Sequence, residues 1–206
     1  AGVDPENGDP LWYMDEEDEN HNPTGKRVTT NDYGSADYYY VNKSSLPKVY
    51  GGFNTSLSWK GFDLSAIFAY SIGGYIYNRD ITMILHNGSL EGRDWSTEIL
   101  KRWTPDNRNT DVPALSTTTN NWNSASTRFL QNNSYMRLKN LTLSYNLPKQ
   151  WISKLSLSSV QVYVQGDNLF TIHRNQGLDP EQGITGITYY RYPAMRTISG
   201  GINVSF

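Results

Sequence analysis

The sequence of 206 residues contains no cysteine, which excludes a disulfide framework, a thiol nucleophile and a cysteine metal site. It also lacks any apolar run near the roughly 18 residues that a membrane-spanning helix needs. Strands that cross a membrane are not excluded, because each needs only about 9–11 residues and can be half polar. Charged residues make up 18% of the chain and the net charge is −2, so we expect no nucleic-acid partner.

What the sequence does contain is a composition typical of strands and loops. Only 37% of the residues are hydrophobic and the mean hydropathy is −0.62, so a large water-excluded core is not indicated. Aromatic residues nevertheless reach 13%, with 15 Tyr and 6 Trp. The polarity comes from Asn, Ser, Thr and Gly rather than from charged groups, which favours strands joined by irregular loops.

The final stretch, residues 197–206, shows strict alternation between apolar or glycine residues and polar or glycine residues. Ile198, Ile202, Val204 and Phe206 share one face, and the intervening positions are Thr, Ser, Gly and Asn. This period of two predicts a strand with one apolar face. Such a strand fits either a soluble sandwich or a membrane barrel.

Four earlier stretches show similar alternation, and Lys60-Gly61 provides a minimal hairpin turn between the first two. Near Lys139-Asn140 the apolar positions change phase, because Met136 and Leu138 precede Leu141 at the wrong spacing; we predict a β-bulge there. The five expected strands cover about residues 49–59, 62–77, 134–147, 157–172 and 195–206.

The remaining segments are polar and are expected to be loops. Residues 1–48 form one loop segment, irregular over residues 1–37, and residues 49–206 hold the strands with loops at 78–133 and 173–194. The acidic run at residues 15–19 is interpreted as solvent-exposed, with calcium binding as the alternative. Residues 94–103 predict one short loop helix, because Trp95, Ile99 and Trp103 recur at helical spacing and Pro105 follows.

The lengths of the connections alternate between short and long along the chain. Because neighbouring strands are antiparallel, every short turn must lie at one end of the sheet and every long loop at the other. This asymmetry is typical of outer-membrane barrels, with short periplasmic turns and long extracellular loops. Five strands cannot close a barrel, since the smallest need about 8. We therefore expect an all-β fold of antiparallel up-and-down strands belonging to a larger transmembrane barrel.

Several motifs also resemble a known family when they are taken together and in order. They are Leu46-Pro47-Lys48-Val49-Tyr50-Gly51-Gly52-Phe53, Trp59-Lys60-Gly61-Phe62-Asp63-Leu64-Ser65, Arg102-Trp103-Thr104-Pro105, Ser134-Tyr135-Met136-Arg137-Leu138-Lys139-Asn140-Leu141, Gln165-Gly166-Asp167-Asn168-Leu169-Phe170, and Gly177-Leu178-Asp179-Pro180-Glu181. As a set they resemble the C-terminal part of SusC/RagA-like TonB-dependent outer-membrane transporters.

The resemblance implies a 22-stranded plugged barrel, of which these are the last five strands. It also implies import of oligosaccharides or peptides, a SusD-like lipoprotein as lid, outer-membrane lipids around the wall, and TonB bound through an N-terminal part outside this sequence. The sequence contains no phosphate-binding loop, no G-x-S-x-G elbow and no H-E-x-x-H motif, so we expect no enzyme activity and no cofactor. Two alternatives stay open: a soluble all-β carbohydrate-binding module, in which Leu64, Ile202 and Val204 would be buried against a second sheet, and a passive porin-type channel.

Candidate functional residues come from the family resemblance and from the residue types in the loops. The resemblance implies that the last strand is read by the barrel-insertion machinery, and exposed loop aromatics beside an arginine suit sugar stacking, lid docking or simple loop packing. The expected assembly signal is Ile202, Val204 and Phe206, and the candidate extracellular contacts are Trp122, Tyr189, Tyr190 and Arg191.

His21, His86 and His173 lie in separate loops and predict no metal site. Asp179 and Glu181 flank a proline and are interpreted as turn residues rather than a glycosidase pair.

Overall fold

The computed structural model describes residues 1–88, 90, 92–116, 121–181, 183–188 and 190–206. The chain divides into two units, which we treat separately: a loop unit of residues 1–42 and 78–130, and a sheet unit of residues 43–77 and 131–206. This division differs from the expected boundary between residues 48 and 49. The difference arises because residues 78–130 pack with the N-terminal segment rather than with the strands that flank them in sequence.

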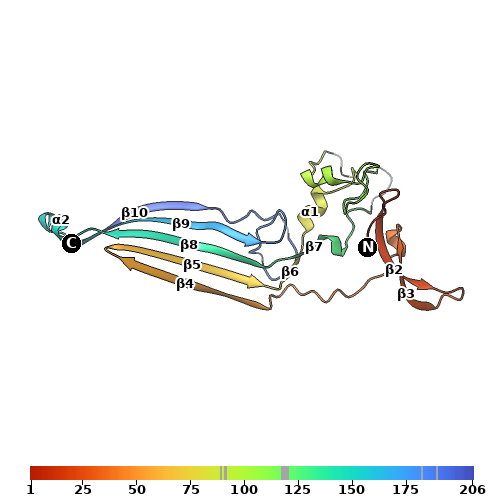
Figure 1. The fold of residues 1–206 in the computed structure, drawn as a ribbon, viewed down its shortest axis with the longest axis horizontal. Coiled ribbons are helices and arrows are strands. Elements are labelled where there is room, and N and C mark those ends of the chain that lie inside the picture. Colours follow the sequence, from red (N-terminus) through yellow and green to blue (C-terminus); the bar gives the residue numbers. More distant parts are fainter. Residues whose placement is uncertain (89, 91, 117–120, 182, 189) are drawn as a thin grey trace. The chain divides into compact units, whose positions relative to one another are not determined.

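The sheet unit is built around a five-stranded antiparallel sheet in the order β10-β9-β8-β5-β4 (Figure 1). Each strand pairs with its neighbour in sequence among these five, so the sheet is a simple meander. The expectation of an all-β chain of antiparallel strands is thereby confirmed. The strands are β4 (Val49–Trp59), β5 (Phe62–Ile72), β8 (Tyr135–Asn146), β9 (Ser159–His173) and β10 (Thr197–Ser205).

The strand expected over residues 62–77 is interrupted in the structure. β5 ends at Ile72, and Gly73 follows with a φ of +92°, a left-handed conformation that turns the chain. Residues Tyr75–Tyr77 then form β6, which pairs with β7 (Leu130–Asn132) in a separate two-stranded sheet. The regular sheet is therefore shorter at this end than alternation alone suggested.

The connections within the sheet follow the expected short and long pattern. Lys60 and Gly61 join β4 to β5, and both have positive φ, as a two-residue type I′ hairpin turn requires. Residues 147–158 join β8 to β9 at the same end and contain α2 (Lys149–Ile152) and η4 (Ser153–Leu155). The long connections after β5 and β9 leave from the opposite end of the sheet.

The two faces of this sheet differ in chemistry because the register aligns like residues across the strands. One row runs through Leu57, Leu64, Leu143 and Val164, and the neighbouring row on the other face runs through Ser56, Ser65, Thr142, Gln165 and Ser199. The apolar face is open: Leu64, Val204 and Ile202 are 40%, 44% and 65% exposed. The soluble sandwich alternative requires these three side chains to be buried, and they are not.

The predicted bulge in β8 is confirmed. Ile67 pairs with Asn140 and Phe68 with Leu138, so Lys139 is an extra residue that has no partner in β5. On the other side, Leu138 pairs with Phe170 and Asn140 with Asp167, and Asn168 between them has a φ of +52°. The bulge restores the phase of the strand, so that residues 136 and 138 share the apolar face with residues 141 and 143.

A tyrosine of β9 lies over a glycine of β10. Tyr163 pairs with Gly201 in the register. A Cβ added at Gly201 would lie 2.6 Å from the Tyr163 hydroxyl oxygen, so a larger residue there would require the end of the Tyr163 side chain to move. Tyr70 of β5 makes a similar approach to Gly51 of β4, where an added Cβ would lie 3.0 Å from the hydroxyl oxygen.

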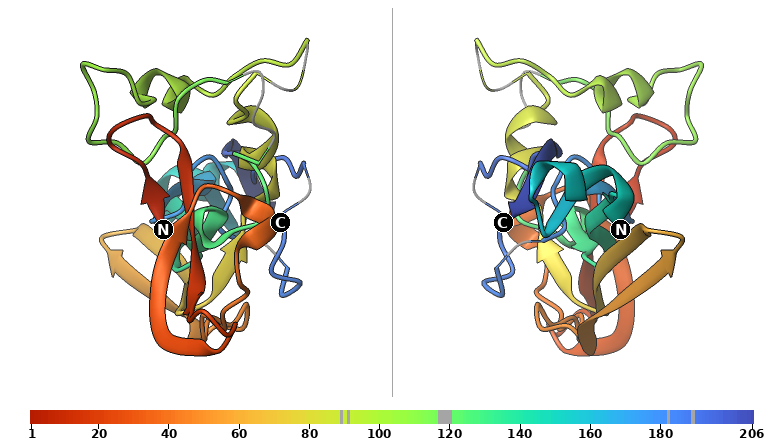
Figure 2. Two further views of the ribbon diagram at one scale, coloured as in Figure 1. Left: turned by 90° about the vertical axis from the view of Figure 1, so that its right-hand side faces the viewer. Right: turned by 90° about the vertical axis from the view of Figure 1, so that its left-hand side faces the viewer.

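The loop unit begins with a three-stranded antiparallel sheet of β1 (Gly2–Val3), β2 (Pro10–Glu17) and β3 (Pro23–Thr30), which is red to orange in Figure 2. The expectation that residues 1–37 are irregular is therefore wrong over this hairpin. The first three residues of the acidic run, Asp15, Glu16 and Glu17, belong to β2, and Asp18 and Glu19 follow in the turn. Asp18 closes the hairpin turn, since its carboxylate accepts the backbone N–H groups of Asn20 and Asn22 at 2.8 and 3.0 Å.

The rest of the loop unit consists of short helices around a small apolar core. Its helices are η1 (Tyr33–Ser35), α1 (Arg79–Ile84), η2 (Thr97–Lys101) and η3 (Thr127–Phe129). η2 replaces the longer helix expected at residues 94–103 and begins after Ser96, whose hydroxyl accepts the N–H of Glu98. No helix in the described ranges is long and apolar enough to cross a membrane. The core comprises Leu85, Ile99, Val112 and Trp122.

Candidate functional site

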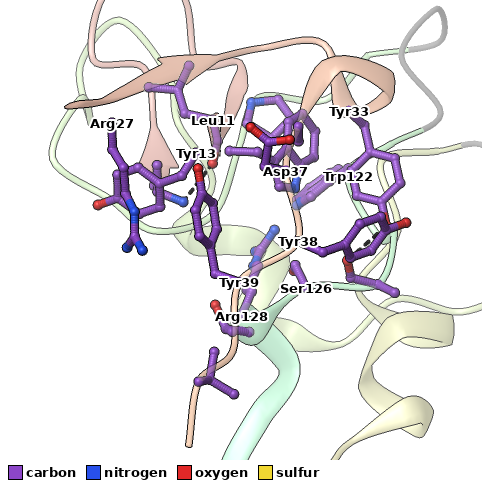
Figure 3. A pocket seen from close by; sticks show the side chains of 18 of the residues that line it. Leu11, Tyr13, Arg27, Tyr33, Asp37, Tyr38, Tyr39, Trp122, Ser126 and Arg128 are labelled. Atoms are coloured by element: carbon purple, nitrogen blue, oxygen red, sulfur yellow. Dashed lines mark hydrogen bonds between the residues drawn. The ribbon is translucent and has the colours of Figure 1, made fainter. Parts of the chain in front are cut away.

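A cavity of about 600 Å³ lies within the loop unit (Figure 3). Its wall is formed by β1, β2 and Arg27 of β3, by the segment around residues 33–41, and by residues of the ranges 111–113 and 122–128. The volume falls in the usual range of small-molecule sites, about 300–1,000 Å³. Aromatic and charged side chains dominate the lining: Trp12, Tyr13, Tyr33, Tyr38, Tyr39, Tyr40, Trp122, Arg27, Arg128, Asp37 and Asp111.

Two segments far apart in sequence are joined at this cavity. Tyr33 packs edge-on against Trp12, with ring centroids 5.2 Å apart, and its hydroxyl donates to the carbonyl oxygen of Ala125 at 2.9 Å. The hydrogen bond spans 92 residues of sequence. It holds the residues after η1 close to the segment that carries Trp122 and Arg128.

Tyr39 and Arg27 form a second part of the wall. The Tyr39 hydroxyl donates to Asp15 Oδ1 at 2.8 Å, and the Arg27 guanidinium lies 3.9 Å from the centroid of the Tyr39 ring. Desolvation and the hydrogen bond to Asp15 raise the pKa of Tyr39 to about 12. The phenol is therefore neutral at physiological pH, and its proton is committed to Asp15.

Arg128 is the second arginine of the cavity lining, and among the described residues it lacks a close counter-charge. Its guanidinium lies 5.6 Å from the ring centroid of Trp122 and 5.5 Å from that of Phe129. Within the described part of the chain no carboxylate comes within 4.0 Å of it. Burial lowers its pKa to about 10, although Asp111 acts in the opposite direction, and the group stays charged at neutral pH.

The candidate contacts predicted from sequence fall in different places. Trp122 is only 2% exposed; it belongs to the apolar core and lines the cavity. Tyr190 and Arg191 belong to the sheet unit and are exposed. Tyr189 lies outside the described residues. The sequence reasoning missed Arg128 and the aromatic wall, although the run Tyr38-Tyr39-Tyr40 was a local signal of aromatic enrichment.

In the sheet unit, a buried charge cluster joins strand β8 to the loop that follows β9. The Arg137 Nη1 atom donates to Glu181 at 2.7 Å, Nη2 donates to Asp179, and Nε donates to Thr171 at 2.9 Å. Lys139, the bulge residue, reaches Glu181 at 2.9 Å. The cluster therefore places the side chains of Arg137 and Lys139 on the same polar side of the sheet.

Asp179 also organises its own loop. Its carboxylate accepts the backbone N–H of Glu181 at 2.9 Å and that of Ala194 at 2.7 Å. Although burial by itself raises the pKa of Asp179, these N–H groups and the Arg137 guanidinium hold it below its usual value. The interpretation of Asp179 and Glu181 as turn residues is confirmed, and both carboxylates are occupied by cations.

The three histidines make separate local contacts. Buried His86 accepts hydrogen bonds at Nδ1 from Trp95 Nε1 at 3.1 Å and from the Gly88 N–H at 3.2 Å. His173 Nδ1 lies 2.6 Å from the Asn175 side-chain oxygen, and His21 Nδ1 lies 3.1 Å from Glu17. Among the described residues, no group of three or more His, Asp or Glu side chains is placed to hold a metal ion.

The expected assembly signal lies on the last strand and just beyond it. Ile202 and Val204 project from the apolar face of β10, opposite Val162 and Val160 of β9. Phe206 follows the strand and is 92% exposed. β10 pairs only with β9 in this sheet, so the backbone groups along its other edge have no strand partner among the described residues.

Comparisons with known proteins agree on one group of relatives. No known family's sequence profile matches the chain. It is 35% identical over 166 residues to the TonB-dependent receptor P3 of Formosa agariphila, a match that covers 75% of this chain and 16% of that protein. It is 27% identical over 198 residues to the TonB-dependent receptor SusC of Bacteroides thetaiotaomicron, with 94% and 19% covered.

A solved structure gives the same result over the full chain. The RagAB peptide transporter superposes with a TM-score of 0.83 and 35% identity, covering 100% of this chain and 22% of that chain. The chain thus spans 16–22% of the length of these relatives.

Proposed function

Because this chain belongs to the SusC/RagA-like family of TonB-dependent outer-membrane transporters, we propose that its five-stranded sheet forms the last five strands of a 22-stranded barrel wall. The observation that carries the proposal is the open apolar face of the sheet, with its polar opposite face. In a barrel, lipid covers the apolar rows and the polar rows line the lumen.

The direction of the strands gives the proposed orientation. The short connections at residues 60–61 and 147–158 lie at the periplasmic side, and residues 1–48, 78–133 and 173–194 lie outside the cell. Trp59, Phe62, Tyr145 and Trp151 then gather at the periplasmic rim, where membrane barrels carry an aromatic girdle. The Arg137 cluster holds the last extracellular loop against the lumenal side of β8.

Transport belongs to the whole protein in this proposal. Its relatives are receptors and transporters rather than enzymes, and we propose energised import of oligosaccharides or peptides, driven through TonB and assisted by a SusD-like lipoprotein. This chain contributes wall and extracellular loop surface. Tyr190 and Arg191, which are exposed, are proposed contacts for substrate or lid. Ile202, Val204 and Phe206 are the proposed assembly signal.

The orientation is testable by cysteine labelling of the full-length transporter with any cysteines outside this chain replaced, since this chain has none of its own. Single cysteines placed at Asn107 in the loop unit and at Lys60 in the hairpin turn of the full-length transporter should differ in access. A membrane-impermeant maleimide added to intact cells should label the first and not the second. Labelling of Lys60→Cys in intact cells, or recovery of the protein from the soluble fraction, would overturn the proposal.

A further inference from the structure

We propose that the cavity of the loop unit is a binding site for a carboxylate-bearing ligand, either an acidic oligosaccharide or an acidic peptide, with Arg128 as the residue that takes the carboxylate. This inference rests on the proposed function, because such a site would select which cargo the transporter holds at its outer surface.

The first support is the charge of Arg128. Arg128 is of intermediate exposure, and a guanidinium that is partly withdrawn from water is stabilised when an anion or several acceptors replace the lost hydration. The Arg128 guanidinium lies 5.6 Å from the ring centroid of Trp122 and 5.5 Å from that of Phe129. Within the described ranges no carboxylate pairs with it. A bound carboxylate would complete the site through the planar, bidentate pairing that guanidinium groups favour.

The second support is that the other charged groups of the cavity are engaged or more distant. Asp37 Oδ2 accepts the backbone N–H of Asp15 at 2.7 Å, and Arg27 lies on the ring of Tyr39. Asp111 acts on Arg128 through space without approaching within 4.0 Å. Asp111 would therefore compete weakly with a ligand carboxylate, and its removal should favour binding of an acid.

The third support is the shape of the wall. Trp12, Tyr33, Tyr38 and Trp122 surround a space of a size that fits a short oligomer. Flat aromatic rings can cover the apolar face of a sugar ring or a peptide unit. The cavity therefore offers an arginine that no described carboxylate pairs with, and a wall of aromatic rings.

The experiment compares matched acidic and neutral ligands on the full-length transporter in detergent. Calorimetry is run with tetraglucuronate and its neutral glucose tetramer, and with a tetrapeptide of Asp and its Asn counterpart. The expected result is that one acidic ligand binds about 10–100-fold more tightly than its neutral match, as a charge-assisted hydrogen bond provides. The pair that shows the preference identifies the source of the carboxylate.

Variants assign that preference to the cavity. Arg128→Gln should abolish it, Arg128→Lys should retain it with weaker affinity, and Asp111→Asn should increase it. Arg108→Gln is the matched control, because Arg108 lies outside the cavity lining in an exposed ion pair with Glu6. Arg128→Lys also guards against misfolding, since it keeps the charge. No acid preference in the wild type, or an unchanged preference in Arg128→Gln, would overturn the proposal.

Failure of this inference is distinguishable from failure of the proposed function. If TonB-dependent uptake of a labelled oligosaccharide or peptide mixture proceeds equally in wild type and Arg128→Gln, the cavity assignment fails while the transporter stands. If the wild type shows no TonB-dependent uptake, the proposed function itself fails.

Discussion

Arg137 of strand β8 donates a hydrogen bond to Asp179, 42 residues further along the chain, and both side chains are almost completely buried. The same arginine reaches Glu181, so one strand residue holds both acidic residues of the loop turn. Removing one member of a buried ion pair leaves the other charge uncompensated.

We expect Arg137→Met to destabilise the full-length protein in detergent by about 3–5 kcal/mol, and the Arg137→Met/Asp179→Leu double variant to recover part of that loss. Lys139→Met is the control, since its ion pair is more exposed and should contribute about 0–1 kcal/mol. Thermal unfolding and tryptic cleavage at Arg191 give the readouts. Equal stability of the Arg137 and Lys139 variants would contradict a stabilising role for the buried ion pair of Arg137 and Asp179.

Deletion of Lys139 should be tolerated better than deletion of Ser65. Lys139 is the extra residue of the bulge, so its removal leaves the residues before and after it on their present faces. β5 has no extra residue, and removal of Ser65 must turn half of that strand over. Heat-modifiable migration on gels measures the folded fraction. A folded Ser65 deletion beside an unfolded Lys139 deletion would refute the assigned register.

Arginine substitutions at two adjacent positions of β8 should differ in their effect on stability, because the two side chains project from opposite faces of the sheet. Leu141 pairs with Ala66 and Gly166 in the middle of the apolar face, and Thr142 pairs with Ser65 and Gln165 on the polar face. Leu141→Arg should cost about 2–4 kcal/mol near the bilayer midplane, whereas Thr142→Arg should fold nearly normally. Urea titration in lipid vesicles compares them. Similar losses in both variants would exclude a lipid-facing row.

Phe206→Ala should reduce the amount of protein assembled in the outer membrane of cells while leaving the thermal stability of the assembled protein unchanged. The reason is that Phe206 is almost fully exposed and supports no packing within the sheet. Trp59→Ala is the matched control, because Trp59 is an exposed aromatic at the same end of the sheet. Equal assembly of both variants in a pulse-chase experiment would contradict the proposal that Phe206 is part of the assembly signal.

The stability of the loop unit should fall in mild acid through His86. Burial lowers the pKa of His86 from its ordinary value near 6.5. Its stabilising contribution is complete above the unfolded pKa and is lost as the pH falls from about 6.5 toward the folded pKa, because the unfolded chain binds the proton first. Limited proteolysis of residues 78–130 at pH 7.5 and 5.5 should show this, and His86→Gln should flatten the difference.

Alternation along the chain was sufficient to predict the sheet. Residues 49–59 and 197–205 form strands close to their expected bounds, and the phase change between Met136 and Leu141 indicated the bulge. These features are local, since the side-chain period of a strand is readable within about ten residues.

The loop unit could not be predicted in this way. The hairpin of β2 and β3 carries acidic residues where strands usually alternate apolar ones, and η2 is shorter than the periodicity at residues 94–103 indicated. The cavity depends on contacts such as Tyr33 to Ala125, across 92 residues. No local sequence pattern predicts a contact between residues so far apart in the chain. Arg128 therefore could not be distinguished in sequence from an ordinary surface arginine.

The contact of Tyr163 with Gly201 has a consequence for accuracy of assembly. If the register between β10 and β9 shifted by two residues, every apolar side chain would stay on the same face of the sheet. Alternation alone therefore does not prevent that error. The slide would bring Ser199 or Asn203 opposite Tyr163, and the end of the Tyr163 side chain would have to move to make room for a Cβ. The contact of one aromatic ring with a glycine therefore favours the observed pairing over the two-residue slips that alternation alone allows.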